Sequence, residues 1–343
     1  MTDTYPAKIE SIEHLEELLS RPTDYVVDAL KKLDGDIIIL GVAGKMGPTL
    51  ARMARRALAP SRKVIGVARF SNPQHQSELE KHGIQTIKAD LLDREQLEKL
   101  PDAPNVVYMP AMKFGSSGAE AMTWAMNTYL AGMCAERYEK SKIVAFSTGN
   151  IYGLSPIVLG GSTENAPLDP KGDYAMSCLG RERMFDHFSR VNVTPTALIR
   201  LNYATEMRYG VLVDMAQKVF RGEEMDLSMG SFNAIWQGDA NAMTLASFAH
   251  VASPPFVLNV AGPEILSVRR VCEEFGRLMN KKPKLVGTEA PDALISNGQL
   301  GHRLFGYPRV SVGQMMGWIA QWVMSGGASL GKPTHFEARD GKY

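Results

Sequence analysis

The sequence predicts an α/β fold in which helices cover both faces of a doubly wound parallel sheet. Apolar runs of strand length, at residues 37–40 and 64–67, are separated by a helical pattern. The first run leads directly into Gly41, Gly44 and Gly47, and the helical pattern begins there. Strand, helix and strand in this order form one βαβ unit, so we predict a Rossmann-type sheet.

Composition limits the kind of protein this can be. The chain has 343 residues, of which 45% are hydrophobic, and a net charge of +1. It can therefore bury a large core, and its charge argues against nucleic acid or an anionic membrane as the main partner. The polar, acidic start is unlike a signal peptide and no apolar run could span a bilayer, so we expect a cytoplasmic protein. The spacing of Cys134, Cys178, Cys272 and the histidines indicates neither disulfides nor a metal site.

Residues 1–35 precede the first strand and contain two short helical patterns. Apolar residues recur at helical spacing over 12–19 and again over 25–33, and Arg21-Pro22 separates the two patterns. We predict an N-terminal helical extension that packs on the outside of the main domain as a structural cap. The alternative is an arm that binds a partner.

The glycines after the first strand have separate physical roles. Gly41 permits the tight turn, Gly44 lets backbone N–H groups approach a pyrophosphate, and Gly47 lets the helix pack closely on the sheet. We therefore interpret this stretch as the phosphate-binding loop for a dinucleotide, and a purely structural turn is the alternative. The loop residues assigned to the cofactor are Gly41, Ala43, Gly44, Lys45, Met46 and Gly47.

The end of the second strand indicates which dinucleotide is bound. Folds that bind NAD usually carry Asp or Glu there to accept hydrogen bonds from the adenosine ribose, whereas a nearby arginine accommodates the 2′-phosphate of NADP. This chain has Ala68 followed by Arg69, with Lys45 as a candidate second cation. The pattern favours NADP over NAD. A solvated Arg69 without a ligand is the alternative.

Three further strands are expected over 85–88, 105–109 and 142–147, with a long helix over 119–139. Parallel strands place the loops at their carboxyl ends on one edge of the sheet, where ligands bind. Asp90-Leu91 and the loop from Ala111 to Lys113 therefore face the same site. Asn127, within the long helix, either bridges backbone groups near these strand ends or is exposed.

This order of motifs resembles the extended short-chain dehydrogenase/reductase family, in its NAD-dependent epimerase/dehydratase branch, over about residues 36 to 324. The matching pieces are the glycine pattern at 41–47, Asp90-Leu91, the loop 111–113, Asn127, the segment 146–153, Tyr174 in its helix, and the segments 200–202, 238–239 and 259–264.

The resemblance implies roles for individual residues. Thr148 matches the catalytic hydroxyl that hydrogen-bonds the substrate oxygen, and Tyr174 matches the catalytic tyrosine. A dinucleotide-binding domain is implied over 36–201 and a mainly substrate-binding lobe over 202–324, part of which returns to the first domain. The residues expected to bind the cofactor are Gly41, Ala43, Gly44, Lys45, Met46, Gly47, Arg69, Asp90, Leu91, Ala111, Lys113, Asn127 and Tyr174.

The chain departs from the family at the catalytic motif, and this makes it an atypical member. The family's Tyr-x-x-x-Lys appears as Tyr174 followed four residues later by Cys178. In the family the lysine holds the nicotinamide ribose and lowers the pKa of the tyrosine. An unperturbed tyrosine has a pKa of about 10, so Tyr174 without a cation suits proton donation in carbonyl reduction better than proton removal in alcohol oxidation. Lys113 is the candidate replacement cation, and a surface or phosphate-contacting role is its alternative.

The residues after position 201 are expected to define the substrate, with Asn202, Arg208 and Phe232 as candidate contacts. Family members that act on nucleotide sugars usually carry an arginine about seven residues before the Asp of the strand expected over 234–239, where it grips the diphosphate. Phe232 stands at that position and cannot neutralise a diphosphate. This favours a free sugar or sugar acid. Arg208 or Arg221 is the alternative diphosphate ligand.

We therefore expect an NADP(H)-dependent oxidoreductase that acts on a carbonyl or hydroxyl group of a carbohydrate-like small molecule. The alternatives are a sugar or nucleotide-sugar epimerase with retained NAD(P), and a non-catalytic dinucleotide-binding sensor or scaffold. The resemblance also implies a homodimer formed through the helices over 119–139 and 174–190. The tail over 325–343 is either disordered or wrapped across the body or a neighbouring subunit.

Overall fold

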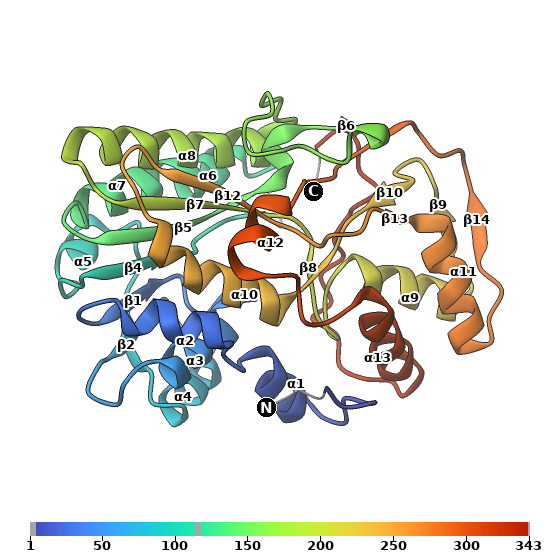
Figure 1. Ribbon diagram of the computed structural model, residues 1–343, viewed down its shortest axis with the longest axis horizontal. Coiled ribbons are helices and arrows are strands. Elements are labelled where there is room, and N and C mark those ends of the chain that lie inside the picture. Colours follow the sequence, from blue (N-terminus) through green and yellow to red (C-terminus); the bar gives the residue numbers. More distant parts are fainter. Residues whose placement is uncertain (1–4, 114–117, 342–343) are drawn as a thin grey trace.

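A computed structural model describes residues 5–113 and 118–341 of the chain. Figure 1 shows parallel strands flanked by helices on the left of the molecule. On the right lies a second lobe built mainly from α9 (Val211–Arg221), α11 (Val268–Met279) and α13 (Val312–Met324). The candidate site lies where these two parts meet.

The central sheet has seven strands, all parallel. Because β1 lies between β2 and β4, the order reverses at β1, and the expected Rossmann-type doubly wound sheet is confirmed. In spatial order the strands are β12 (Phe256–Val260), β7 (Thr196–Leu201), β5 (Lys142–Thr148), β4 (Asn105–Tyr108), β1 (Ile37–Leu40), β2 (Val64–Ala68) and β3 (Gln85–Lys88).

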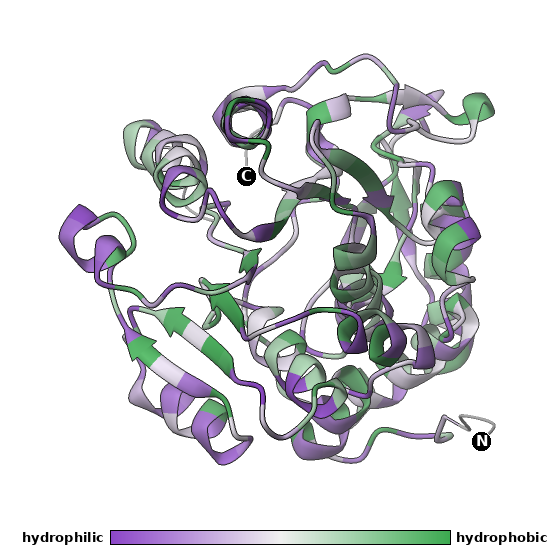
Figure 2. Cartoon of the chain, turned by 60° about the vertical axis from the view of Figure 1, so that its left-hand side comes forward, coloured by the Kyte–Doolittle hydropathy of each residue, from purple (hydrophilic) through white to green (hydrophobic). Residues whose placement is uncertain are grey.

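Alternate residues of each strand point to opposite faces, and each face has its own core. In β1, Ile37 and Ile39 belong to one core, and Ile38 and Leu40 belong to the other. In Figure 2 the strands are largely green, and purple is prominent on the peripheral helices. The first face is covered by α2 (Asp24–Lys31), α3 (Gly47–Ala57), α4 (Pro73–Lys81) and α10 (Gln237–Ala246), and the second by α5 (Arg94–Glu98), α7 (Leu130–Arg137) and α8 (Gly172–Asn192).

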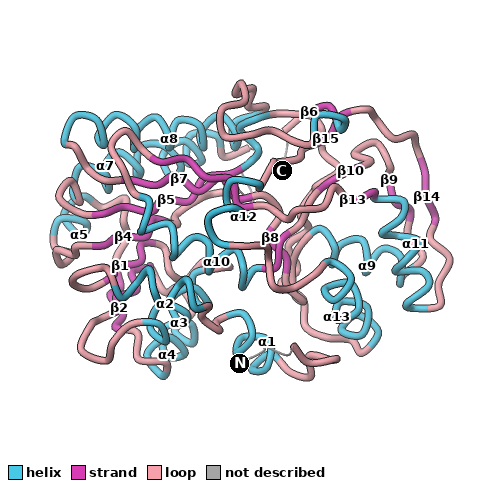
Figure 3. Tube along the Cα trace, viewed as in Figure 1, coloured by secondary structure: helices cyan, strands magenta, loops and turns pink. Residues whose placement is uncertain are grey.

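The second lobe has a separate hydrophobic core and only short strands. Figure 3 shows how much of this part of the chain is helix and loop. The strand pairs are β10 (Ser231–Phe232) with β13 (Leu266–Ser267), β11 (Ile235–Trp236) with β8 (Ala204–Thr205), β14 (Lys284–Val286) with β9 (Glu224–Asp226), and β15 (Asp292–Ala293) with β6 (Ser155–Pro156). Elsewhere in the chain lie α12 (Gln299–Phe305), which packs against the core on the first face of the sheet, and short 3-10 turns at Gly149–Tyr152, Ile157–Leu159 and Ser247–His250.

The structure corrects two expectations about individual elements. The helix expected over 119–139 is interrupted, because a π-helical turn at Ala125–Tyr129 separates α6 (Glu120–Trp124) from α7. The strand expected over 234–239 is wrong, since β11 ends at Trp236 and Asp239 belongs to α10. The buried Asp239 carboxylate accepts a hydrogen bond from the Val310 backbone N–H at 3.1 Å, which ties α10 to the second lobe.

The N-terminal helices are packed into the two cores. α1 (Ile12–Leu19) contributes Leu15, Leu18 and Leu19 to the core of the second lobe, and α2 contributes Val26 and Leu30 to the core on the first face of the sheet. The extension therefore joins both parts of the molecule and buries its apolar stripes in doing so.

The C-terminal tail wraps across the body of its own chain. The Thr334 backbone N–H and hydroxyl both donate hydrogen bonds to one carboxylate oxygen of Asp214 on α9, at 2.7 and 2.6 Å. Two residues further on, the buried Phe336 ring packs against Phe232, with ring centroids 6.2 Å apart. These contacts hold the tail against the second lobe, between α9 and β10.

Candidate active site

The glycine-rich loop between β1 and α3 borders the candidate site. Gly41 has a φ of +78°, in the left-handed region that favours glycine. Any side chain at Gly47 would collide with the Val42 carbonyl oxygen, so only glycine lets α3 begin this close to β1. An added Cβ at Gly44 would meet only the Gly41 oxygen, at 3.5 Å. Internal packing therefore explains Gly41 and Gly47, whereas Gly44 faces a cavity.

Two adjacent cavities follow this loop along the carboxyl edge of the sheet. The smaller, of about 370 Å³, lies at the tip of β2 and is lined by Arg69, Asp90 and Leu91. The larger, of about 720 Å³, extends from the loop to α8 and the second lobe. Both are lined by Gly41, Ala43, Gly44 and Ala111, so their walls are continuous.

The larger cavity brings together residues from distant parts of the sequence. Besides the residues that both cavities share, seven of the residues predicted from the sequence line the larger cavity. They are Lys45, Met46, Lys113, Thr148, Tyr174, Asn202 and Arg208. Gly47, Asn127 and Phe232 line neither cavity. Lys45 and Arg69 are also separated, because Lys45 lines only the larger cavity and Arg69 only the smaller.

Asn127 is a buried bridge within the π-helical turn. Its amide oxygen accepts a hydrogen bond from the Met112 backbone N–H at 2.8 Å, and its amide nitrogen donates to the Met112 carbonyl at 3.1 Å and to the Ser177 hydroxyl at 3.0 Å. It therefore fixes the loop that carries Lys113 against α8. Of the two alternatives drawn from the sequence, the structure shows the bridge.

Thr148 and Tyr174 meet at one end of the larger cavity. Thr148 ends β5, and its hydroxyl accepts a hydrogen bond from the Asn150 backbone N–H at 3.2 Å. Tyr174 lies in the first turn of α8 and forms side-chain hydrogen bonds with Thr148 and Cys178. Burial raises the pKa of Tyr174 well above its ordinary value of 10.0. The phenol is therefore held neutral and can donate a proton.

Lys113 lies beside this tyrosine. Its Nζ atom is 5.9 Å from the centroid of the Tyr174 ring and donates a hydrogen bond to the Thr334 carbonyl oxygen at 3.3 Å. Burial lowers the pKa of Lys113 to about 8. The Lys113 ammonium, which we hypothesised to replace the missing lysine, is therefore next to the Tyr174 ring. It comes from the loop after β4, whereas the family's lysine lies four residues after the tyrosine on the same helix.

Arg181 is a second cation near Tyr174 that the sequence analysis missed. It is buried two helical turns after Tyr174 and donates hydrogen bonds to the Phe146 carbonyl at 3.0 Å and to the Asn127 amide oxygen at 2.9 Å. Its charge opposes the rise that burial causes in the pKa of both Tyr174 and Cys178. The sequence could have indicated Arg181 through its spacing from Tyr174, because residues seven apart share one face of a helix.

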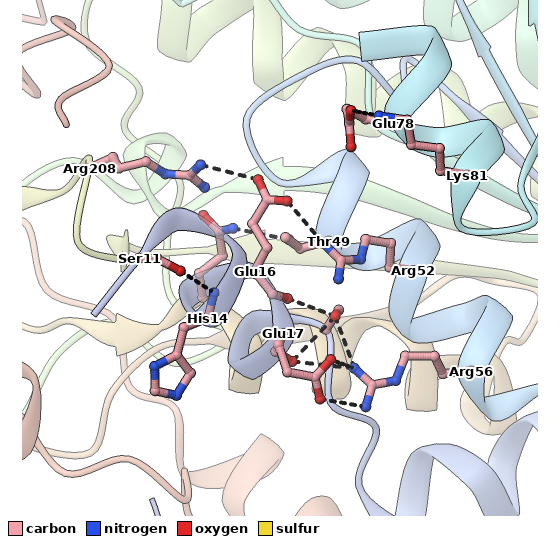
Figure 4. Close-up of polar contacts among 12 residues, drawn as sticks. Ser11, His14, Glu16, Glu17, Thr49, Arg52, Arg56, Glu78, Lys81 and Arg208 are labelled. Carbon is pink, nitrogen blue, oxygen red and sulfur yellow. Dashed lines mark hydrogen bonds and ion pairs between the residues drawn. The ribbon is translucent and has the colours of Figure 1, made fainter. Parts of the chain in front are cut away.

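An ion-pair network around Glu16 of α1, shown in Figure 4, borders the larger cavity. Glu16 accepts hydrogen bonds from Arg52 of α3 at 2.9 Å and from Arg208 at 3.2 Å. Arg208 also pairs with the buried Glu206 at 3.1 Å. The Arg208 guanidinium is thus already paired with two carboxylates. Nothing in the sequence pattern marks Glu16, which sits on the polar side of a predicted helix.

The other substrate candidates have structural partners. Asn202 is buried and donates a hydrogen bond to the Asn233 amide oxygen at 2.6 Å. Phe232 is covered by Phe336 of the tail. Arg221 is largely exposed, with 60% of its side-chain surface accessible, and lies outside the cavity lining. Asn202 alone of these three faces the larger cavity.

No helix in the described part of the chain is both long and apolar enough to cross a membrane. Within residues 5–113 and 118–341, no three His, Cys, Asp or Glu side chains gather as a metal-binding group. The cysteines Cys134, Cys178 and Cys272 are free, buried thiols.

Solved structures with a similar fold include two UDP-sugar 4-epimerases. UDP-glucuronic acid 4-epimerase from Bacillus cereus, in complex with NAD, is 16% identical and superposes with a TM-score of 0.71, covering 84% of this chain and 99% of that chain. UDP-glucose 4-epimerase from Thermotoga maritima, with UDP-glucose, is 17% identical with a TM-score of 0.70, covering 85% and 99%. MoeE5, in complex with UDP-glucose and NAD, is 17% identical with a TM-score of 0.67, covering 85% and 99%.

The chain shares the fold of these proteins. No protein-family model matches the chain. The comparison with curated proteins likewise found no match. The expected Rossmann-type architecture is thus supported by both the strand order and the superpositions.

Proposed function

We propose that the protein binds a nicotinamide dinucleotide along the two cavities and transfers hydride at a carbon of a sugar-like substrate. The observation that carries this proposal is the hydrogen-bonded pair of Thr148 and Tyr174, at the far end of a cavity that begins at the glycine-rich loop. A bound dinucleotide supplies or accepts the hydride. The side chains hold the substrate oxygen and supply the proton.

The loop residues fit such a cofactor. Gly44 leaves the backbone open toward the cavity, and Met46 at the start of α3 provides no side-chain cap for the first N–H groups of the helix. Unpaired N–H groups and the positive end of the helix dipole favour a pyrophosphate. Ala43, Gly44 and Met46 would hold the pyrophosphate, and Asp90 and Leu91 would border the adenosine.

We propose NADP(H) as the preferred dinucleotide. Arg69 is exposed at the end of β2, borders the smaller cavity and follows Ala68, so a cation takes the place of the ribose-binding acid. A guanidinium there would pair with the 2′-phosphate. Two of the solved structures named above are complexes with NAD, so the proposal of NADP(H) rests on this chain's own strand end.

Reduction of a carbonyl is the reaction that the Tyr174 environment supports best. The buried neutral phenol donates its proton to the oxygen as hydride reaches the carbon, and Thr148 holds that oxygen by hydrogen bonding. The substrate would be a free sugar or sugar acid, since Phe232 is covered by the tail and Arg208 is already paired with Glu16 and Glu206.

Epimerisation of a nucleotide sugar by a retained dinucleotide is the second candidate, and the comparisons favour it over free-sugar reduction. The neighbours named above include two UDP-sugar 4-epimerases. An epimerase needs Tyr174 to remove a proton in one half of the reaction, and the Lys113 ammonium beside its ring would support that role. A dinucleotide-binding sensor that lacks catalysis is the third candidate.

One assay separates these candidates. Purified protein would be mixed with NADPH or NADH and a panel of sugar carbonyls, and separately with UDP-glucose or UDP-glucuronate. Net loss of reduced nicotinamide indicates a reductase, and interconversion of sugars without net change indicates an epimerase. Dinucleotide binding with neither reaction favours the sensor. Failure to bind either dinucleotide overturns all three.

We also propose a homodimer formed through α6 and α8. Met122, Trp124 and Tyr129 on the segment before α7, and Met176 on α8, are exposed apolar side chains, between 36% and 53% accessible. Such a patch is unusual on a monomer's surface and is suited to a second copy. Sedimentation analysis of a Met122→Glu, Met176→Glu double variant should show monomers where the wild type shows dimers. A monomeric wild type would contradict this proposal.

A further inference from the structure

Two buried lysines face the larger cavity from different loops. Lys45, in the glycine-rich loop, donates a hydrogen bond from Nζ to the Ala204 carbonyl oxygen at 2.8 Å, and Nζ lies 3.7 Å from the centroid of the Tyr209 ring. Lys113, after β4, donates to the Thr334 carbonyl and faces the Tyr174 ring. Both side chains line the same cavity wall as the catalytic pair.

Keeping these two charges in the protein is costly. The pKa of Lys45 is lowered to about 7, chiefly by burial and partly by the positive charges of Lys113 and Arg208, whereas Glu206 and Asp214 oppose this shift. The Lys45 ammonium contacts a backbone carbonyl and an aromatic ring, which are both neutral. These neutral partners satisfy N–H donors without neutralising the charge, which Glu206 and Asp214 offset without a direct contact.

The nearby carboxylates are already engaged by other groups. Glu206 is bonded to the Arg208 backbone N–H at 2.7 Å and to its guanidinium. Asp214 accepts both hydrogen bonds from Thr334. An anion that enters the cavity would therefore be attracted by two buried ammonium groups, those of Lys45 and Lys113.

The direction of Lys45 indicates that this anion belongs to the substrate. Its side chain does not line the cavity that contains Arg69 and instead reaches Ala204 and Tyr209, which precede α9 in the chain. Lys113 is next to Tyr174, so a group bound between the two lysines would lie close to the reacting oxygen.

We propose that Lys45 and Lys113 together bind an oxyanion of the substrate, a carboxylate or a phosphate attached to the sugar. This inference rests on the proposed function, because it names the class of substrate that the same cavity takes. It gives Lys45 a role in substrate choice, distinct from the cofactor role expected from its place in the glycine-rich loop.

The test uses full-length protein loaded with reduced dinucleotide and titrated with glucuronate, glucose 6-phosphate, inorganic phosphate and glucose. Nicotinamide fluorescence and calorimetry would report binding to wild type, Lys45→Met and Lys113→Met. The control is Lys140→Met, an exposed lysine just before β5, at the opposite edge of the sheet. Methionine keeps the length and apolar stem of lysine, so the buried variants should remain folded.

We expect the anions to bind about tenfold or more tightly than glucose. Lys45→Met and Lys113→Met should each weaken anion binding about tenfold and leave glucose binding unchanged. Lys140→Met should bind all four compounds as wild type does. Tighter binding of glucuronate would identify a carboxylate as the recognised group, and tighter binding of glucose 6-phosphate would identify a phosphate. Dinucleotide affinity of Lys45→Met should stay within about twofold of wild type.

Three results would overturn the inference. The first is equal binding of anions and glucose by wild type. The second is loss of dinucleotide affinity in Lys45→Met as large as the loss of anion affinity, which would make Lys45 a cofactor ligand. The third is no calorimetric response to any anion by dinucleotide-loaded protein. A wild type that binds no dinucleotide is a different outcome, since it rejects the proposed function itself.

Discussion

The two cavities of the candidate site differ in how the chain builds them. The smaller is lined only by residues between Gly41 and Leu130, so consecutive βαβ units of one half-sheet form it. The larger is lined by residues from Glu16 to Thr334, which come from the N-terminal helices, both sides of the sheet, the second lobe and the tail. A local pattern can therefore specify the smaller cavity, whereas the larger exists only after long-range packing.

The charges in the two cavities differ in the same way. Arg69 at the smaller cavity is exposed, so water screens its charge. Lys45 and Lys113 at the larger cavity are buried, and burial lowers the pKa of both. We infer that the smaller cavity contributes affinity for a dinucleotide and that the larger contributes chemistry and substrate choice. The following predictions test that division of roles.

The largest effect is expected at the catalytic end of the larger cavity. Tyr174→Phe removes the proton donor, and we expect turnover to fall by about 10² to 10⁴, with dinucleotide affinity unchanged. Steady-state rates and a fluorescence titration would measure both. Tyr307→Phe is the matched control, because that tyrosine is 74% exposed. Unchanged turnover in Tyr174→Phe would show that Tyr174 is not the proton donor and would contradict a catalytic role for the larger cavity.

A paired glycine experiment separates packing from ligand binding at the loop that both cavities share. In Gly47→Ala the new methyl group would collide with the Val42 carbonyl oxygen, and we expect about 1 to 3 kcal/mol of destabilisation in urea unfolding. Gly44→Ala meets only an ordinary contact at 3.5 Å, so stability should be nearly unchanged while dinucleotide affinity falls. Equal stability losses in the two variants would contradict this assignment.

The affinity for anions should depend on pH through the larger cavity alone. The free protein loses the Lys45 proton near its pKa of about 7, whereas a bound anion stabilises the ammonium, so binding takes up a proton. Affinity for glucuronate should be level below that pKa and fall by up to about tenfold per pH unit above it. The charged groups that act on Lys45 are Glu206, Lys113, Arg208 and Asp214.

The Lys45→Met variant provides the control for this titration. It should lose the step near pH 7 and keep the weaker decline caused by Lys113, whose pKa is about 8. Calorimetry at a series of pH values would measure it. A pH profile that is the same in the variant and in wild type would show that Lys45 is not the titrating group.

The smallest effect is expected at the exposed end of the smaller cavity. Arg69→Ala should weaken NADPH binding by about tenfold or less and leave NADH binding unchanged, because water screens the exposed guanidinium. Titrations at low and high salt would check this, since the loss should shrink as salt rises. Equal weakening of both dinucleotides would show that Arg69 does not recognise a 2′-phosphate.

Local features of the sequence specify the fold well. The expected strand over 85–88 has the bounds of β3, and that over 37–40 has the bounds of β1. The glycine-rich loop also follows from a local pattern, whereas Thr148 and Tyr174 were singled out by the resemblance in motif order. Apolar periodicity and glycine requirements act between residues close in sequence, and such signals can be read along the chain.

The sequence by itself thus determined the doubly wound sheet, the glycine-rich loop after β1 and the absence of a lysine four residues after Tyr174. Only the tertiary structure decided that Lys113 lies beside Tyr174, that Glu16 pairs with Arg208, and that Phe336 covers Phe232. These pairs are separated by up to about two hundred residues, and no periodicity links them. Their contacts arise because the two cores and the tail pack together, and that packing depends on the whole chain.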